Sequence, residues 1–327
     1  RRAARRREGR LPAAEPLGSL RGDERTVTTP DGVRLHVEVD EADGSDAQPT
    51  IVFVHGYALN LHCWHFQRQA LRGRYRLVFY DQRSHGRSSR SDDKRSTIDQ
   101  LGADLRQVLD EVVPTGPVVL VGHSMGGMTA MALAEQAPEL FGERVVGVGL
   151  LATSAGDLDR VTFGLPRMPG RMLHRTGPGA LAVLARMPGF VESGRRAGSE
   201  LISLVTQRYA FGSEVDPELA EFTDEMLAAT PIGVVSAFLP AFARYHKYDA
   251  LDAFRRVALL IVSGTKDQLT PVGHGREIAK RLPSAYSTEL EGAGHMLMLE
   301  RAEAVNLALE ELVRRSTKDR RRARGTA

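Results

Sequence analysis

The fold is decided by the stretch VVLVGHSMGGMTA at residues 118–130. Its first four residues are apolar without polar alternation, which is typical of a strand buried on both faces of a parallel sheet. Gly122 and Gly126 flank Ser124, and residues 128–136 have a helical pattern. Because glycine has no Cβ, the backbone can turn sharply there and hold the serine beside a helix N-terminus. The stretch therefore predicts a strand, a tight turn that presents a hydroxyl, and a helix.

Further apolar runs predict more strands of the same sheet. They lie at residues 51–54, 77–80, 145–151 and 257–262. Between two of them, residues 97–113 have apolar side chains at helical spacing. Strand, helix and strand in succession indicate an α/β fold with a doubly wound, mostly parallel sheet and helices on both faces.

The sequence predicts a hairpin before this sheet. Residues 25–30 and 33–40 flank the turn signal Pro30-Asp31-Gly32, and apolar and polar residues alternate along the second segment. We expect the two strands to be antiparallel and half exposed.

The strand runs are interrupted over nearly a hundred residues, which are rich in Leu, Met, Ala and Phe. We expect this segment to be a helical cap inserted over the carboxyl ends of the strands, where α/β sheets place ligand sites. The predicted domains are a core at 25–154 and 251–315, the cap at 155–250, a basic disordered segment at 1–24 and a basic tail at 316–327.

Charge is distributed unevenly along the chain. The net charge is +3, but residues 1–10 carry +5, residues 314–327 carry +6, and the body between them carries −8. Basic ends can bind nucleic acid or anionic lipid. Because an acidic body offers no basic groove to continue such a contact, we expect no nucleic-acid partner and interpret the ends as solvated and disordered.

Cysteine usage and the termini bear on the compartment. Cys63 is the only cysteine, so no disulfide can form within the chain, and a reducing cytoplasmic location is expected. The sequence begins with Arg1 rather than Met. If an upstream segment was removed, the arginine cluster would flank a membrane anchor on its cytoplasmic side. Weak membrane association through the basic N-terminal segment of a longer form is therefore a second hypothesis.

A nucleophilic serine needs a general base, and the base needs an acid that orients it, in the chain order serine, acid, histidine for folds of this type. Asp267 follows the apolar run at 257–262, on a loop just beyond the end of that predicted strand. His295 follows a second predicted strand, at 285–290, on a glycine-rich loop. The order and placement predict Ser124 as nucleophile, His295 as base and Asp267 as orienting acid.

The oxyanion that forms on attack requires preorganised donors. His55-Gly56-Tyr57 follows the strand run at 51–54, and the flexible glycine allows the Tyr57 backbone N–H to turn toward the site. The backbone N–H of Met125 is the second predicted donor. We interpret His55 as a residue that pins this loop by hydrogen bonding rather than as a second base.

Two other polar clusters are interpreted as structural. His62, Cys63 and His65 lack the matching distant pair that a tetrahedral metal site needs, so we expect an inert cysteine and neither a metal nor a cofactor. Residues 81–88 follow a strand run, and their charge and glycine content predict a hydrogen-bonded turn.

Taken together, His55-Gly56, residues 81–88, residues 122–127, Asp267 and His295 resemble the α/β-hydrolase superfamily. The similarity covers roughly residues 25–315 and implies the α/β-hydrolase fold with an inserted helical cap. The turn departs from the frequent family form because Ser84 stands where glycine is usual, and we expect only a local change. Family epoxide hydrolases and dehalogenases carry Asp at the position of Ser124, so those activities are not expected.

The resemblance implies hydrolysis of carboxylic esters through an acyl-enzyme, with an uncharged, fairly apolar small-molecule ester and water as substrates. The same triad also serves C–C hydrolases, lactonases, thioesterases and cofactor-free perhydrolases. A ligand-binding module that retains the triad is a further alternative.

The candidate substrate-binding residues are Phe163 and Met168 in the cap, with His123 and Met296 beside the predicted serine and histidine. Apolar side chains of the cap either line an acyl or alcohol pocket or form the cap's own core. Both interpretations stay open at this point.

Overall fold

The structure is a computed structural model that describes residues 15–44, 48–158 and 209–325 of the chain, with side chains described up to residue 318. Phe163 and Met168 lie outside these residues.

The described residues form a sheet of eight strands in the order β1-β2-β4-β3-β5-β6-β7-β8. The strands are β1 Asp23–Thr28, β2 Arg34–Asp40, β3 Thr50–Val54, β4 Leu77–Tyr80, β5 Val118–His123, β6 Val145–Leu151, β7 Ala258–Gly264 and β8 Tyr286–Leu290. The pairs β1–β2 and β2–β4 are antiparallel, and every pair from β4 to β8 is parallel. The predicted mostly parallel sheet is confirmed.

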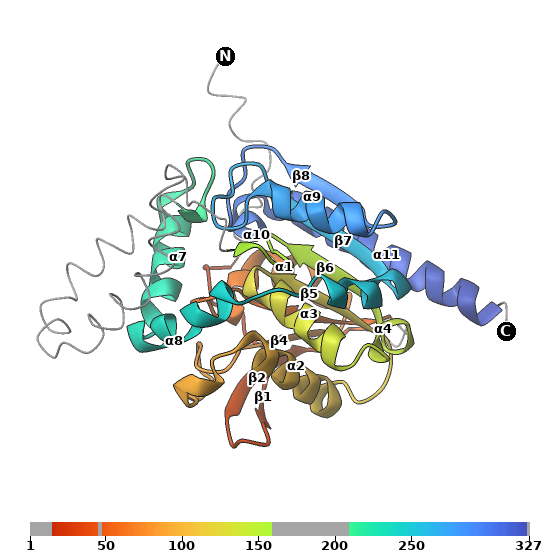
Figure 1. Cartoon of the computed structure of the whole chain (residues 1–327), viewed down its shortest axis with the longest axis horizontal. Helices are drawn as coiled ribbons and strands as arrows, with labels where there is room; N and C mark the ends of the chain where they lie inside the picture. Colours follow the sequence, from red (N-terminus) through yellow and green to blue (C-terminus); the bar gives the residue numbers. More distant parts are fainter. Residues whose placement is uncertain (1–14, 45–47, 159–208, 326–327) are drawn as a thin grey trace, which may run out of the picture.

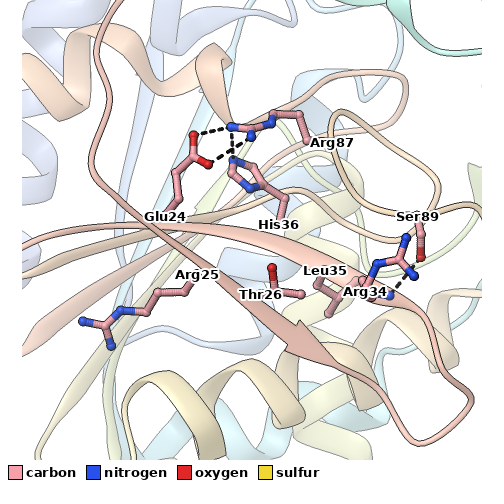
Figure 2. Close-up of a pocket in the computed structure, with 8 residues that line it drawn as sticks. All are labelled: Glu24, Arg25, Thr26, Arg34, Leu35, His36, Arg87 and Ser89. Atoms are coloured by element: carbon pink, nitrogen blue, oxygen red, sulfur yellow. Dashed lines mark hydrogen bonds and ion pairs between the residues drawn. The ribbon is translucent and has the colours of Figure 1, made fainter.

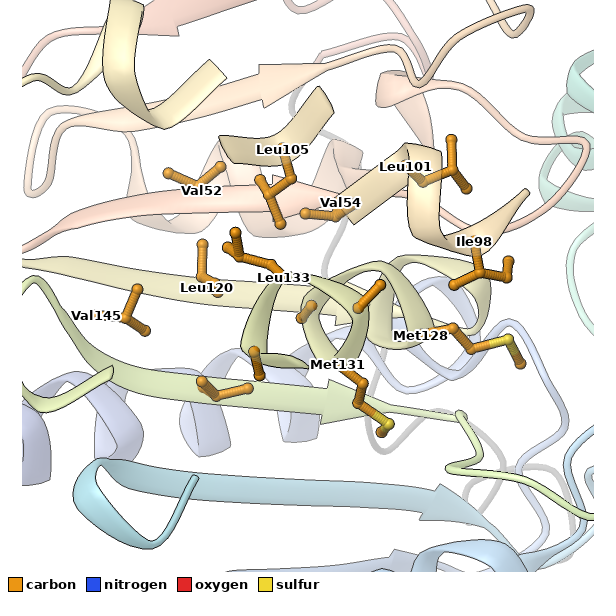
Figure 3. Close-up of a cluster of buried hydrophobic side chains, with 14 of the residues drawn as sticks. Val52, Val54, Ile98, Leu101, Leu105, Leu120, Met128, Met131, Leu133 and Val145 are labelled. Carbon is orange, nitrogen blue, oxygen red and sulfur yellow. The ribbon is translucent and has the colours of Figure 1, made fainter. Parts of the chain in front are cut away.

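Helices cover both faces of the sheet (Figure 1). One face carries α2 Ile98–Val112, α3 Met125–Gln136, α4 Leu140–Glu143, η6 Asp249–Arg256 and α9 Val272–Arg281. The other carries η2 Leu61–Trp64, α1 His65–Leu71, α10 Leu297–Glu300 and α11 Ala302–Gly325. Figure 3 shows how α2 and α3 pack onto β3 and β5, with Leu105 beside Val54.

Helix α2 begins where the sequence predicts it. The Thr97 hydroxyl accepts a hydrogen bond from the Gln100 N–H at 3.1 Å, which caps one of the free donors of the first turn. Its buried side chains follow the spacing of one helical face. A short 3-10 helix, η3 Asp93–Arg95, precedes it.

The predicted hairpin is present, but the expected half exposure is wrong for its second strand. Gly32 has φ +82° in the turn, and its N–H donates to the Thr29 carbonyl at 2.8 Å. Strand β1 is mostly exposed, whereas every residue of β2 after Arg34 is buried. The polar face of β2 is buried because α1 covers it and supplies an arginine, Arg68, to its carboxylates.

The inserted segment between β6 and β7 is described at residues 155–158 and 209–250. It contains the helices α7 Pro217–Ala229 and α8 Ile232–Ala243. The end of the inserted segment lies beside its beginning: the Lys247 N–H donates to the Ala155 carbonyl at 2.7 Å. In the described part of the chain, no single helix has the length and apolar composition needed to cross a membrane. Helices α7 and α8 reach that length and apolar composition only when taken together, and they are bent by 87° relative to each other.

Both chain ends differ from the expected disordered tails where they are described. At the C-terminus, α11 continues to Gly325, so residues 316–325 extend a helix whose first part packs on the sheet (Figure 1). At the N-terminus, the Gly18 N–H donates to His65 Nδ1 at 3.3 Å and the Gly22 N–H to Glu38 at 3.0 Å. Residues 18–22 are therefore held against α1 and β2.

Candidate active site

Ser124 occupies a strained turn between β5 and α3. Its φ is +50° and its ψ −115°, a region that non-glycine residues rarely adopt. Its N–H donates to the Leu151 carbonyl at 2.9 Å, and its own carbonyl accepts the Thr153 hydroxyl at 2.7 Å. The surrounding backbone thus holds the strained conformation that presents the serine at the carboxyl end of the sheet.

The glycines around Ser124 are required by close backbone approach. A Cβ at Gly126 would lie 2.0 Å from the Val54 carbonyl oxygen, and one at Gly122 would lie 2.5 Å from Gly126. A Cβ at Gly127 would lie 2.7 Å from the Thr153 side chain. The tight turn predicted from the glycine spacing is confirmed, and α3 can approach β3 so closely because Gly126 lacks a side chain.

His295 and Asp267 form a buried hydrogen-bonded pair. His295 Nδ1 lies 2.8 Å from Asp267 Oδ2, and the Thr270 hydroxyl donates to the same oxygen at 2.8 Å. Asp267 Oδ1 accepts the N–H groups of Leu269 and Thr270 at 2.8 and 3.0 Å. Burial raises the pKa of Asp267, but the charge and hydrogen bonds of His295 and Thr270 outweigh it, so the pKa lies below its ordinary value. The acid is therefore ionised and fixed toward the imidazole.

His123 joins the serine turn to the histidine loop. Its Nε2 lies 3.0 Å from the His295 carbonyl oxygen, and the two rings are 4.8 Å apart between centroids. Burial, with the neighbouring His295, lowers the pKa of His123 to about 3, so the ring is neutral and Nε2 carries the proton. The His123 side chain has no exposed surface and lies between the serine turn and the His295 loop. Met296 is likewise buried, and its N–H donates to the Ala210 carbonyl at 2.8 Å.

His55 fixes the loop that follows β3. Its Nε2 accepts the Gln82 N–H at 2.9 Å, its Nδ1 lies 2.7 Å from the Gly56 carbonyl, and the Gln82 amide donates to the His55 carbonyl at 2.7 Å. Burial, with nearby His85, lowers the pKa of His55 to about 3. The interpretation of His55 as a loop-pinning residue is confirmed. Since β3 and β5 are neighbours, Tyr57 and Met125 both stand at the same sheet edge.

The side chains of this loop contact the inserted helices. The Tyr57 ring packs against Phe242, with centroids 5.0 Å apart, and its hydroxyl donates to the Val235 carbonyl on α8. From the turn between α7 and α8, the Thr230 hydroxyl donates to the Ala58 carbonyl at 3.1 Å. Ala58 has φ +58°, so this loop, like the serine turn, contains a residue in the left-handed region. Sequence reasoning missed these links, because nothing in the local pattern indicates which helix the loop will meet.

The predicted turn at residues 81–88 is confirmed. Asp81 accepts the Leu61 N–H on Oδ1 and the Arg87 N–H on Oδ2, both at 2.8 Å. Ser84 has φ +65°, the left-handed region that glycine adopts without strain. The departure from the usual glycine is thus local, and the Ser84 hydroxyl accepts the Ser91 N–H at 3.0 Å.

A candidate metal group lies elsewhere, on the hairpin. Glu24, His36 and Glu38 bring three possible ligand atoms within 4.8 Å of one another. Figure 2 shows Arg87 directed at two of these residues; its guanidinium donates to both Glu24 oxygens and lies 3.3 Å from His36 Nε2. A cation already occupies the position, so we assign no metal there.

Glu24, His36 and Arg87 also line a surface cavity of about 410 Å³ on β1, β2 and the turn after β4. Its lining residues are Glu24, Arg25, Thr26, Arg34, Leu35, His36, Arg87 and Ser89 (Figure 2). The edge strand β1 is separated from β5 by three strands, so this cavity is not part of the site around Ser124.

Comparisons with known proteins agree on one family for this chain. The sequence profile of the alpha/beta hydrolase family matches residues 51–308 of this chain. The 3-oxoadipate enol-lactonase 2 of Acinetobacter baylyi is 25% identical over 297 residues, which cover 89% of this chain and 96% of that protein. The dihydrolipoyllysine-residue acetyltransferase component of the acetoin cleaving system of Pseudomonas putida is 27% identical over 83% of this chain, which spans only 65% of that longer protein.

Solved structures share the fold. The enol-lactonase from Burkholderia xenovorans has a TM-score of 0.69 and 25% identity, and the match covers 89% of this chain and 99% of that one. A thermophilic esterase from Thermogutta terrifontis has a TM-score of 0.68 and 23% identity, over 90% and 99% of the two chains. The resemblance indicated by the sequence motifs is confirmed.

Proposed function

Since the chain belongs to the alpha/beta hydrolase family and is a hydrolase, we propose that it cleaves carboxylic esters with Ser124 as nucleophile, His295 as general base and Asp267 as orienting acid. The observation that carries this proposal is the pair of His295 and Asp267, joined through His123 to the strained serine turn. An ionised acid on Nδ1 leaves Nε2 of the same ring available to take the serine proton.

The reaction follows two steps. Ser124 Oγ attacks the ester carbonyl carbon as His295 Nε2 takes its proton, and the tetrahedral intermediate collapses with transfer of that proton to the leaving alcohol. Water, deprotonated by His295, then releases the acid from the acyl-enzyme. The backbone N–H groups of Tyr57 and Met125 are the donors proposed for the oxyanion. Met125 begins α3, and the first N–H groups of a helix have no partner within it.

The substrates proposed are uncharged, fairly apolar esters. Tyr57 and the aromatic residues of α8 pack against one another at the carboxyl edge of the sheet, which supports an apolar contact surface above the serine turn. Lactones are a second candidate, because a lactone is a cyclic ester and two of the similar proteins are enol-lactonases.

The test uses p-nitrophenyl esters from acetate to palmitate, with labelling by a fluorophosphonate probe in parallel. Wild type should turn over and label, and Ser124→Ala should lose both. Ser154→Ala is the matched control, because Ser154 Oγ also lies 2.9 Å from a histidine nitrogen, His274 Nδ1, yet bonds within its own turn to Gly156. This control should keep both signals. A folded wild type that neither turns over nor labels would refute the proposal and favour a binding module.

A further inference from the structure

Glu300 is a buried carboxylate five residues after His295. Its side chain has no exposed surface, and it ends α10 beneath the histidine loop. Oε2 accepts the Gly294 N–H at 2.7 Å and the Gly212 N–H at 3.1 Å, and Oε1 accepts the Ser213 hydroxyl at 2.6 Å. A buried carboxylate is costly unless such donors surround it. One side chain therefore connects the residue before His295 to the chain that enters α7.

The two connected segments also meet through their backbones. The Met296 N–H donates to the Ala210 carbonyl at 2.8 Å. A Cβ at Gly294 would lie 2.4 Å from the Gly212 nitrogen, and one at Gly212 would lie 2.5 Å from the Gly292 carbonyl oxygen. His295 is thus flanked on both sides by residues bonded to the segment 210–213, one through Glu300 and one directly.

We propose that Glu300 is a positioning residue that fastens the His295 loop to residues 210–213, so that the ring meets Asp267 in register. This inference rests on the proposed function of His295. Residues 210–213 belong to the inserted segment, and the loop geometry of the base is therefore coupled to the seating of that segment.

Two substitutions of Glu300 distinguish the effect of its hydrogen bonds from the effect of its charge. Glu300→Gln can place its carbonyl oxygen where Oε2 lies and keep both backbone bonds, while its amide donates to the Ser213 hydroxyl. Glu300→Met has a similar length but accepts no bond. Because misplacement of a catalytic group by about 1 Å costs about 10²-fold in rate, we expect kcat for p-nitrophenyl esters to fall about 10²-fold in Glu300→Met, with KM within about threefold. Glu300→Gln should stay within about threefold of wild type.

Asp104→Asn serves as a control that distinguishes a positioning role of Glu300 from a contribution to stability alone. Asp104 of α2 is another buried carboxylate, which accepts two hydrogen bonds of 2.6 Å from Arg83 in the turn after β4. This control should lower the melting temperature and leave kcat unchanged at temperatures where the protein is folded. Glu300→Met should lower kcat at those same temperatures.

A readout independent of turnover is the low-field proton resonance of the His295 Nδ1–H that bonds Asp267. It should be sharp in wild type and Glu300→Gln and broadened or absent in Glu300→Met. If Glu300→Met is recovered unfolded, Glu300→Asp retracts the same carboxylate by one methylene and should show an intermediate loss. The inference is overturned if the folded Met variant keeps the resonance and wild-type kcat, or if Gln is as slow as Met. An inactive wild type with these resonance changes would instead contradict only the proposed function.

Discussion

Ser124 holds a conformation that costs free energy, and its neighbours supply the contacts that keep it there. The glycine at 126 carries the greatest constraint, because the Val54 carbonyl oxygen occupies the position of a Cβ. Strain of this kind persists only where packing over-determines the backbone. The turn is therefore specified by absent side chains as much as by the serine itself.

Gly126→Ala should lower the free energy of unfolding by about 3 kcal/mol, because the new methyl group must displace backbone rather than a flexible side chain. Gly273→Ala is the matched control: no atom lies within 4 Å of its Cβ position in α9, and alanine favours helix. Urea denaturation of both variants measures the difference. Equal stabilities would show that the serine turn is not held as described.

Asp267→Asn should reduce kcat by about 10⁴-fold with little change in fold, because an amide favours the wrong imidazole tautomer. The measurement is the kcat of p-nitrophenyl ester hydrolysis, with circular dichroism as a check on folding. Activity within tenfold of wild type would assign the orienting role to another acid.

At this scale the sequence predicted the serine turn, the placement of Asp267 and His295 on neighbouring loops and the loop-pinning role of His55, because each belongs to a local motif at a strand end. It did not predict the buried place of His123 or the tether of Glu300. Both make their key bonds with residues that their own neighbourhoods do not indicate, His295 for the first and Gly212 for the second.

At the scale of elements, β2 shows why alternating apolar and polar residues gave a wrong prediction of half exposure. Its alternating pattern predicts one wet face, yet Glu38 and Asp40 are buried under α1. Arg68 of α1 satisfies both, with hydrogen bonds of 2.6 Å to Glu38 and of 2.7 and 2.8 Å to Asp40. A lone arginine in a helical pattern gives no sign of this pairing. The same network helps fix the entry of the N-terminal segment, through the Gly22 N–H.

Arg68→Met should destabilise the protein by about 3 to 5 kcal/mol at pH 7, because it removes the cation that both buried carboxylates share and leaves Asp40 only the longer contact of 3.5 Å with half-exposed Arg72. Burial raises the pKa of Glu38, but His36, Arg68 and Gly22 lower it to about 2 overall. This stabilisation is present above the ordinary pKa of 4.5 and is lost as the pH falls toward 2. The difference between variant and wild type, measured by urea denaturation, should therefore shrink in acid.

The control is Arg25→Met. Arg25 pairs with Glu41 at 3.5 Å on the surface, with side chains 42% and 52% exposed. Its removal should change stability by less than about 0.5 kcal/mol. Similar losses of stability in Arg68→Met and Arg25→Met would mean that the buried ion pairs of Arg68 stabilise the protein no more than a surface pair does.

At the scale of the whole molecule, three buried neutral histidines make stability depend on pH. Burial is the largest cause that lowers the pKa of His55 and His123 to about 3 and of His85 to about 4. In the unfolded chain each takes up a proton below its ordinary value of 6.5, so stability is lost as the pH falls from 6.5 toward 4. Burial also raises the pKa of Asp81 to about 6, which opposes this effect by one proton.

Burial also lowers the pKa of His62 to about 4. With these four histidines and Asp81, the net uptake of about three protons on unfolding near pH 5 predicts a loss of about 4 kcal/mol per pH unit there. Urea denaturation between pH 7 and pH 5 measures this slope. Exchange of His85 for glutamine should reduce it by about one proton, whereas the same exchange at exposed His246 should leave it unchanged. A flat profile over this range would show that these rings titrate normally in the folded state.

Also at this scale, the sheet, its parallel order and its covering helices could be predicted, since buried strand runs and helical spacing repeat along the chain. The C-terminal boundary could not. An arginine-rich stretch after residue 313 has the composition of a solvated tail, but it follows a helix whose Leu309 and Leu312 are fixed on the sheet, and arginine propagates helix well. Tertiary packing upstream thus decides the structure of a segment that has no apolar pattern of its own.

The residue that carries the acyl group in the acyl-enzyme identifies the nucleophile. Wild type is mixed with p-nitrophenyl butyrate, quenched in acid within the first turnover, digested and mapped by mass spectrometry. We expect a butyryl group on the peptide that contains Ser124, absent from Ser124→Ala and retained in Ser154→Ala. An acyl group on another residue, or turnover in Ser124→Ala at the wild-type rate, would contradict the assignment of Ser124 as the nucleophile.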